Sequence, residues 1–429
     1  MRRTVGMVVG ACTVLALAGA AGTVACAYDR DGIGQTVGEW QPAPGDARTP
    51  VAVTKPTPEG GRHRVGTLKK VDRLIGYATT GRETFHYPGA SYVKLHFSRV
   101  ALRPGDYVTI KDRTGAESYR YDAAPAGGAL RGGQLSGGLL SGLDAGGWAM
   151  SITGDTAVLD LHRRAGVGAL NRLGVTVDRV ARGFTRMEQE GAEPGQAGRT
   201  GRTGREESIC GGDQSADAIC YKSSDPVAYT RSRAIARLLI NGTELCTGWR
   251  VGPKNRMLTN NHCFASSADA YQTEVWFNYQ CARCGGYDVV RPTKVWGDRV
   301  LATNRTYDYT VFTVEQFAEV EKFGYLALDT RRPNRNDELY IPQHPAGEPA
   351  RIAGSRGDRA GTCAVADRAY DGYAADSDVS YYCDTQGGSS GSPVLSRATH
   401  KVVALHHFGG CPNSGVRGDL ILAKIEKLL

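Results

Sequence analysis

The chain has 429 residues, of which 22% are charged and 41% are hydrophobic, and this composition is ordinary for a globular protein. Its length predicts two folded units, and its 56 glycines favour turn-rich β structure over helix bundles. The net charge of +8 is modest, and no run of Lys and Arg is interleaved with aromatic residues, so we do not expect nucleic acid as a partner.

Residues 1–27 are typical of a signal peptide. Arg2 and Arg3 give a basic start, and residues 8–21 are small and apolar but too few to cross a bilayer comfortably. The Ala-Cys-Ala sequence at 25–27 is similar to a signal-peptidase cleavage site. We therefore predict secretion. Lipid anchoring through Cys26 is the alternative, although threonine stands where a lipobox usually has leucine.

The next two segments differ in pattern. Residues 28–65 are rich in Pro, Gly, Asp and Arg and show little periodicity, which predicts a disordered lead-in. Residues 66–187 alternate between apolar and polar side chains in several short runs, as half-buried strands do. Strands are expected around 93–97, 107–111, 148–152 and 157–161, with a glycine-rich loop at 127–147. This pattern predicts a β-sandwich, whose histidines we interpret as strand or surface residues rather than ligands: His86, His96 and His162.

Residues 188–208 lack large apolar side chains and repeat Gly-Arg, which predicts an unfolded linker. The segment is either a flexible tether or a processing junction cut after Arg199, Arg202 or Arg205. Apart from Cys12 and Cys26, every cysteine lies at or after Cys210. This abrupt start of a cysteine-rich region favours the junction, because disulfides staple exported domains.

Residues 209–429 are expected to form one domain of many short strands. Strand-like runs occur at 234–240, 257–259, 274–278, 309–314, 394–395 and 402–405. Apolar spacing after Leu420 indicates a single terminal helix. This region therefore belongs to the all-β class, as a pair of barrels or a sandwich.

Three residues of this region fit the roles of acyl transfer. Ser390 lies between glycines in a tight loop, where its hydroxyl can attack a carbonyl and the N–H groups of Gly388 and Ser390 can hold the oxyanion. His262 follows an apolar strand and is anchored by Cys263, so it fits the proton acceptor. Asp308 precedes a half-buried strand and fits the carboxylate that orients His262. The chain order His, Asp, Ser is that of chymotrypsin-like enzymes.

Several motifs support a resemblance at this point. They are Thr-Asn-Asn-His-Cys at 259–263, Cys-Thr-Gly at 246–248, Phe-Asn-Tyr-Gln at 277–280, Asp-Tyr-Thr-Val at 308–311, Gln-His-Pro at 343–345, Gly-Ser-Ser-Gly-Ser-Pro at 388–393 and Leu-His at 405–406. From about Cys210 onward the chain resembles trypsin-like (chymotrypsin-fold) serine peptidases, and among them the secreted bacterial lysyl endopeptidases. The same nucleophile loop occurs in glutamyl endopeptidases. The resemblance implies a double β-barrel with the site in the cleft between the barrels.

The resemblance also implies disulfides and activation by processing. The implied pairs are Cys210–Cys411, Cys220–Cys284 and Cys246–Cys263. We add Cys363–Cys383 as our own pairing, which leaves Cys281 unpaired. Relatives are made with a long pro-region, so the sandwich is expected to be a pro-domain of a zymogen, released by cleavage after Arg205. Digestive trypsins carry aspartate where this chain has Ser389, so activation by their new N-terminal ion pair is not expected.

Two interpretations remain open for which residues select the substrate side chain at the cleaved position. A buried carboxylate at Asp384 or Asp419 would favour Lys or Arg at the cleaved position, because a buried cation needs a partner. Alternatively, Thr385 with His406 and His407 would receive an acidic side chain, as in glutamyl-specific relatives. We favour basic specificity.

We expect neither metal nor cofactor, because Cys281 and Cys284 form a lone CxxC without a second pair at zinc-finger spacing. The expected protein is a monomeric serine endopeptidase that acts on protein or peptide substrates. The alternative is a secreted module that uses the same fold for binding without catalysis.

Overall fold

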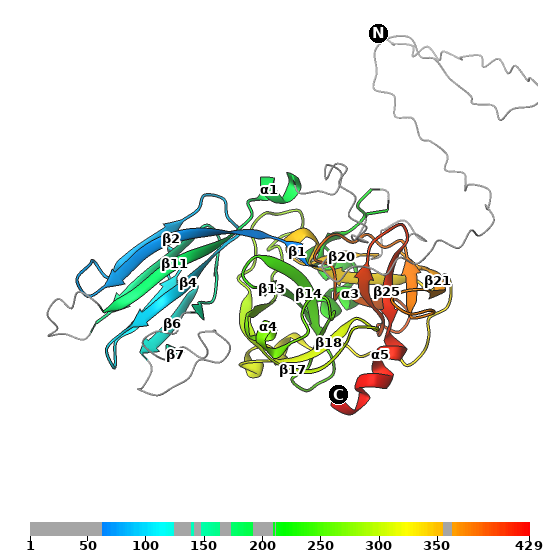
Figure 1. Cartoon of the computed structure of the whole chain (residues 1–429). Coiled ribbons are helices and arrows are strands. Elements are labelled where there is room, and N and C mark those ends of the chain that lie inside the picture. Colours follow the sequence, from blue (N-terminus) through cyan, green and yellow to red (C-terminus); the bar gives the residue numbers. More distant parts are fainter. Residues whose placement is uncertain are drawn as a thin grey trace, which may run out of the picture. The chain divides into compact units, whose positions relative to one another are not determined.

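The computed structural model describes residues 62–123, 139–140, 147–163, 173–191, 209–210, 212–354 and 363–429 (Figure 1). The expected signal peptide, the anchoring Cys26 and the processing sites Arg199, Arg202 and Arg205 lie outside these ranges, as does most of the expected loop at 127–147. Across the described part of the chain, no helix is both long and apolar enough to cross a membrane.

The N-terminal part consists of two β-layers that are antiparallel except for the parallel pairing of β6 with β7. One has the order β3-β10-β5-β6-β7 and the other β2-β11-β4-β8, with β9 pairing with β4. A single apolar core containing Leu95, Val108 and Leu159 joins the layers, so this region is a β-sandwich. Its elements are β2 (Gly66–Gly76), β3 (Arg82–His86), β4 (Tyr92–Ala101), β5 (Tyr107–Lys111), β6 (Ser118–Ala123), β7 (Leu139–Leu140), β8 (Gly147–Trp148), β9 (Ile152–Thr153), β10 (Thr156–His162), β11 (Gly174–Gly183) and α1 (Arg186–Gly191).

Strand β4 departs from the half-buried pattern expected of it. Val93, Leu95 and Phe97 face the sandwich core, but Lys94 on the opposite side is also fully buried. Its ammonium group pairs with Glu274 of the following barrel. The outward face of this strand is therefore covered by protein rather than by water, and alternation alone could not reveal this.

The next region is a closed barrel. The seven-stranded sheet has the order β1-β14-β13-β16-β17-β18-β15, and an additional pairing between β14 and β15 closes six of its strands into a ring. The strands are β1 (His63–Arg64), β13 (Ile235–Ile240), β14 (Glu244–Arg250), β15 (Met257–Thr259), β16 (Thr273–Phe277), β17 (Thr293–Asn304) and β18 (Tyr309–Val314). Strand β1 lies in the segment expected to be a disordered lead-in, so that expectation is wrong for its last residues.

The C-terminal sheet has eight strands in the order β12-β20-β19-β23-β24-β25-β22-β21. A bridge between Glu338 and Ala364 brings the start of β19 beside the start of β21, so the sheet curls back on itself. Its strands are β12 (Ala216–Asp217), β19 (Leu339–Gln343), β20 (Arg351–Ala353), β21 (Val365–Tyr370), β22 (Asp378–Tyr381), β23 (Pro393–Ser396), β24 (Val402–Phe408) and β25 (Asn413–Arg417). The expected all-β class is confirmed.

The helices are short and lie in connections or at the C-terminus. The expected terminal helix is α5, extended by η6, whereas α2, α3 and α4 were not expected. The helices after the sandwich are η2 (Ala218–Cys220), α2 (Tyr221–Ser224), α3 (Pro226–Ser232), α4 (Ser267–Tyr271), η3 (Phe317–Glu319), η4 (Glu321–Phe323), η5 (Pro345–Gly347), α5 (Gly418–Ile425) and η6 (Glu426–Leu428).

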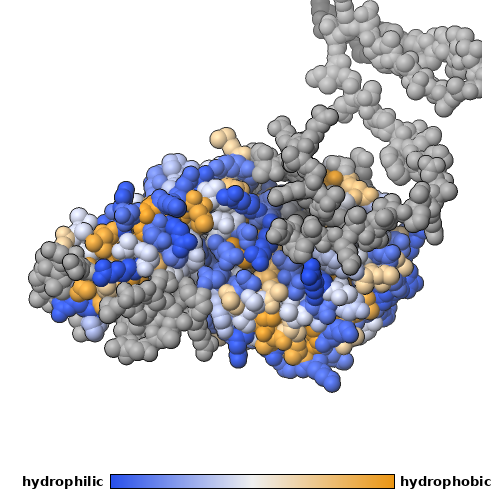
Figure 2. Space-filling model, in the orientation of Figure 1, coloured by the Kyte–Doolittle hydropathy of each residue, from blue (hydrophilic) through white to orange (hydrophobic). Residues whose placement is uncertain are grey.

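The surface carries small apolar groups. On the face shown in Figure 2, hydrophobic residues occur in small groups among hydrophilic ones. Two of the exposed apolar side chains, Leu68 and Leu74, come from β2. Small groups of this kind are ordinary on protein surfaces, so they do not by themselves indicate a binding face.

Candidate active site

The pairing of β15 with β18 brings His262 to Asp308. Thr259, at the end of β15, lies opposite Thr310 in β18, so the residues just beyond these two positions meet. The Nδ1 atom of His262 lies 2.7 Å from Oδ2 of Asp308, and the His262 backbone N–H donates to Oδ1 at 2.9 Å. The carboxylate therefore holds both the ring and the backbone of the histidine.

This pairing sets the chemical state of the histidine ring. Asp308 is buried, which alone would raise its pKa, but His262 and His407 hold the pKa below its usual range. The ionised carboxylate makes Nδ1 of His262 a hydrogen-bond donor, so in the neutral ring Nε2 is the proton acceptor. Nε2 is buried and has no hydrogen-bond partner within the described ranges.

The nucleophile loop is held against the same barrel. The N–H of Thr247 in β14 donates to the carbonyl of Ser390 at 2.8 Å, and the Thr247 hydroxyl donates to the carbonyl of Gly388 at 2.9 Å. The Cys246–Cys263 disulfide links β14 to the residue after His262. Ser390 thus lies next to the loop that carries the histidine, and the structure brings the three expected residues to one place.

Glycine is required at Gly388 and Gly391 of this loop. Both have positive φ, 97° and 88°. A Cβ at Gly388 would lie 2.3 Å from Cδ2 of Leu245, and one at Gly391 would lie 2.1 Å from the carbonyl oxygen of Thr247. The loop can approach β14 this closely only without side chains, and this explains the glycines on either side of the serine pair.

A second histidine reaches Asp308 from the C-terminal sheet. Nδ1 of His407 in β24 lies 3.0 Å from Oδ2 of Asp308, the same oxygen that His262 contacts. Nε2 of His407 lies 2.6 Å from Oδ2 of Asp378 in β22. The sequence suggested His407 only as a receptor for an acidic substrate, and it did not single out Asp378. Neither residue lies in a local motif that points to this role.

Besides His407, the residues expected to choose the substrate divide into two groups. Asp384 accepts hydrogen bonds from the backbone N–H groups of Cys210, at 3.0 Å, and Gln214, at 2.8 Å. Asp419 forms a two-pronged ion pair with Arg417, at 2.6 and 3.1 Å. Both carboxylates are therefore already engaged within the chain.

Thr385 and His406 form the other group. The Thr385 hydroxyl and Nε2 of His406 are buried without hydrogen-bond partners in the described part of the chain. Burial lowers the pKa of His406 to about 3, so its ring is neutral at pH 7. Its backbone is bonded on both sides to the nucleophile loop: its carbonyl accepts from Gly391 at 2.9 Å, and its N–H donates to Ser392 at 3.0 Å.

The described residues form four disulfides, and they are the expected pairs: Cys210–Cys411, Cys220–Cys284, Cys246–Cys263 and Cys363–Cys383. Cys281 is a buried free thiol, and burial raises its pKa to about 11. Cys246, Cys263 and His262 lie close enough to suggest a metal site. The two sulfurs are joined to each other, however, so they cannot supply thiolates to a metal.

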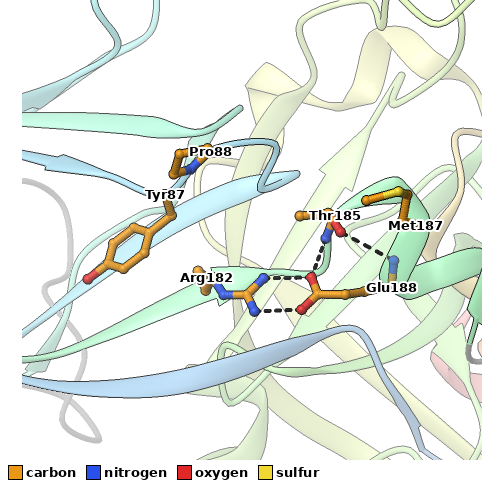
Figure 3. Close-up of a pocket in the computed structure, with 6 residues that line it drawn as sticks. All are labelled: Tyr87, Pro88, Arg182, Thr185, Met187 and Glu188. Carbon is orange, nitrogen blue, oxygen red and sulfur yellow. Dashed lines mark hydrogen bonds and ion pairs between the residues drawn. The ribbon is translucent and has the colours of Figure 1, made fainter.

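Away from these residues, a hollow lies on the sandwich next to α1 and has a volume of about 510 Å³ (Figure 3). Its main charged groups are Arg182 and Glu188, which pair through two contacts of 2.6 and 2.7 Å. Glu188 also accepts from the N–H of Thr185 at 2.7 Å, and its own N–H donates to the Thr185 hydroxyl at 3.2 Å. This reciprocal arrangement caps α1, so these groups serve the fold.

The residues that match a known family include His262, Asp308 and Ser390. Residues 246–405 match the family model described as a trypsin-like peptidase domain. The chain is 38% identical over 218 residues to secreted RxLR effector protein 73 of Plasmopara viticola, covering 49% of this chain and 53% of that protein. It is 31% identical over 194 residues to the uncharacterized protein y4fB of Sinorhizobium fredii, covering 42% of this chain and 28% of that protein. The chain thus spans about half or less of the length of these relatives.

Solved structures of peptidases are also similar to part of the chain. A Glu endopeptidase in complex with MPD has a TM-score of 0.38 and 18% identity, covering 51% of this chain and 98% of that one. The HtrA-type protease AlgW with a tripeptide has a TM-score of 0.34 and 12% identity, covering 48% of this chain and 63% of that one. Residues 246–405 are thus the part of this chain that matches the model of the trypsin-like peptidase domain.

Proposed function

We propose that the protein is a serine endopeptidase. The observation that carries this proposal is Oδ2 of Asp308 at 2.7 Å from Nδ1 of His262, with the opposite ring nitrogen buried and unpartnered within the described ranges. Ser390 attacks the peptide carbonyl while Nε2 of His262 takes its proton. The N–H groups of Gly388 and Ser390 stabilise the oxyanion. His262 then protonates the leaving amine, and water hydrolyses the acyl-enzyme with the histidine again as base.

A fluorophosphonate probe tests this mechanism, because it modifies an activated serine hydroxyl. The wild-type protein, cut in its linker and freed of the N-terminal part, should be labelled, and Ser390→Ala should not. Ser232→Ala is a matched control, since Ser232 is buried in α3, and this variant should label as the wild type does. If the wild-type protein freed in this way is not labelled, the binding module without catalysis is the better description.

For specificity we propose preference for an acidic side chain at the cleaved position, rather than the basic preference suggested by the resemblance to lysyl endopeptidases. Asp384 and Asp419 already have partners, so neither is available as the counter-ion of a substrate cation. The Thr385 hydroxyl and Nε2 of His406 lack partners among the described residues, and a carboxylate can accept hydrogen bonds from both.

Digestion of a mixed peptide library separates the two specificities. We expect cuts after Glu, and we expect Thr385→Val to reduce kcat/KM for Glu peptides about tenfold or more through loss of one hydrogen bond to a charged group. Asp419→Asn should leave the preference unchanged. Cuts after Lys or Arg that disappear in Asp384→Asn would instead establish the basic pocket.

We propose in addition that the N-terminal sandwich restrains the enzyme as a pro-domain. His63 and Arg64 of β1 pair with Leu245 and Glu244 of β14, and the Val65 N–H donates to Thr243 at 2.8 Å. A Cβ on Gly387 would lie 2.3 Å from Nδ1 of His63, so this segment packs on the nucleophile loop. His262 protonates the leaving amine, so the released part of a substrate would lie on the His262 side of the site. The residue after His262 is disulfide-linked to β14, the strand with which β1 pairs. Strand β1 would therefore cover that side.

Activity before and after linker cleavage tests this restraint. The intact chain should hydrolyse peptides slowly, and cleavage at 199–205 followed by removal of the N-terminal part should raise the rate. The cut but unseparated complex should stay slow, because β1 remains on β14. Equal rates in all three samples would contradict the proposal.

We propose an extracellular location. Four disulfides need an oxidising compartment to form and persist, and the name of the Plasmopara relative describes that protein as secreted. Fractionation of cells that express the full chain should recover the protein in the medium, whereas lipid anchoring through Cys26 would retain it in the membrane fraction.

A further inference from the structure

His407 and Asp378 extend the proposed catalytic pair, and this inference rests on the proposed function. Oδ2 of Asp308 has two imidazole neighbours, His262 at 2.7 Å and His407 at 3.0 Å. The other nitrogen of His407 faces Asp378 at 2.6 Å. Because both ring nitrogens of His407 face carboxylates, the ring carries a hydrogen on each and is a cation.

The surroundings keep this group dry and fixed. Both His407 and Asp378 are buried. Asp378 also accepts from the hydroxyls of Ser377 and Ser414, each at 2.9 Å. A Cβ on Gly372 would lie 2.1 Å from Oδ1 of Asp378, so the backbone closes over the carboxylate without leaving room for a side chain.

Electrostatics gives the direction of the effect on the histidine. The groups that face His407 are Asp308, Asp378, the neighbouring ring of His406 and the ring of Tyr373, with His262 across Asp308. Burial alone would lower the pKa of His407, but Asp378 and Asp308 raise it to about 9. At pH 7 its positive charge partly neutralises Asp308, which weakens the support that Asp308 gives to a protonated His262.

We propose that His407, held by Asp378, is a positioning residue that fixes Asp308 and lowers the pH at which His262 becomes a competent base. The peptidase would then work in more acidic surroundings than it would with a neutral residue at this place. This positioning role requires no further reactant in the hydrolysis. His407 keeps both ring hydrogens throughout, and of the two histidines only His262 gains and loses a proton.

The test is the pH profile of kcat/KM in protein cut in its linker and freed of the N-terminal part. His407→Gln removes the cation but keeps an N–H donor for Asp308, so the midpoint of the acid limb should rise by about one pH unit. Adding Asp378→Asn to this variant should lower the midpoint again, because a buried negative charge is removed. His400→Gln, at a histidine that contacts the Tyr340 hydroxyl and not Asp308, is the matched control and should leave the midpoint unchanged. A lower maximum with an unmoved midpoint would mean that His407 is only structural, and would overturn the proposal.

Two further measurements keep the outcome interpretable. Fluorophosphonate labelling of the wild type and of each variant shows whether Ser390 is reactive. Absence of labelling in the wild type would mean that the serine mechanism itself is wrong, which is a different outcome from failure of the His407 proposal. If His407→Gln does not fold, proton NMR of Ser390→Ala decides the matter. Both ring N–H signals of His407 should be present at pH 7 and should persist above pH 8. A single ring N–H signal at pH 7 would contradict the proposal.

Discussion

Two buried charge clusters in this protein contrast with each other. The first joins the sandwich to the barrel: Lys94 pairs with Glu274, and Lys294 pairs with Glu117 at 2.7 Å. Glu274 also accepts from Ser151 and Trp276, and Lys294 also donates to the carbonyl of Ser151 at 2.8 Å. The carboxylates and ammonium groups of this cluster thus all have partners.

The second cluster consists of His262, Asp308, His407 and Asp378, and one buried nitrogen in it, Nε2 of His262, has no partner among the residues that the structure describes. A closed cluster can only hold the fold together, whereas a cluster with one orphaned acceptor can take up a proton. The two clusters should therefore respond differently to mutation: the first through stability and the second through reactivity.

The largest effect is expected at the nucleophile. Ser390→Ala should reduce kcat by about 10⁶-fold. Its unfolding midpoint should remain close to that of the wild type, because only a hydroxyl is removed. Steady-state peptide hydrolysis and urea unfolding measured on the same preparation check both statements. Retained hydrolysis would remove Ser390 from the mechanism.

The orienting carboxylate should come next. Asp308→Asn should reduce kcat about 10⁴-fold, because an amide no longer enforces the required tautomer of His262. Crystallography of the variant should show the ring in place. A loss below tenfold would mean that Asp308 does not orient the base.

The first cluster should respond in stability. Lys94→Met removes one partner of a buried ion pair and should cost about 3–5 kcal/mol in the free energy of unfolding. Lys69→Met, on the exposed side of β2, is the matched control and should change stability by less than about 0.5 kcal/mol. Urea denaturation of the two variants measures the difference. Equal stabilities would show that water already solvates Lys94.

The smallest effect is the pH dependence of stability in the second cluster. The folded pKa of His407 is about 9, above its ordinary value of 6.5, so its stabilising contribution is complete below 6.5 and is lost as the pH rises through 9. The unfolding midpoint of the wild type should therefore fall between pH 7 and pH 10 by more than that of His407→Gln. Parallel curves for the two proteins would show that His407 carries no extra proton.

Local patterns predicted much of this molecule. The apolar runs at 257–259 and 309–314 coincide with β15 and β18, and the residues flanking them are those that meet in the site. What the sequence could not predict depends on contacts between distant strands. Examples are the burial of Lys94, the pairing of His63 with β14 and the contact of His407 with Asp308. Asp384 shows the same limit, because its backbone partners lie far away in the chain.

The most direct test of the central claim is to locate the covalent adduct. Protein cut in its linker and freed of the N-terminal part is treated with a fluorophosphonate, digested, and analysed by tandem mass spectrometry. The account predicts one modified residue, Ser390, with modification blocked in Asp308→Asn and in Ser390→Ala. An adduct on Ser389 or elsewhere, or unchanged modification in Asp308→Asn, would contradict it.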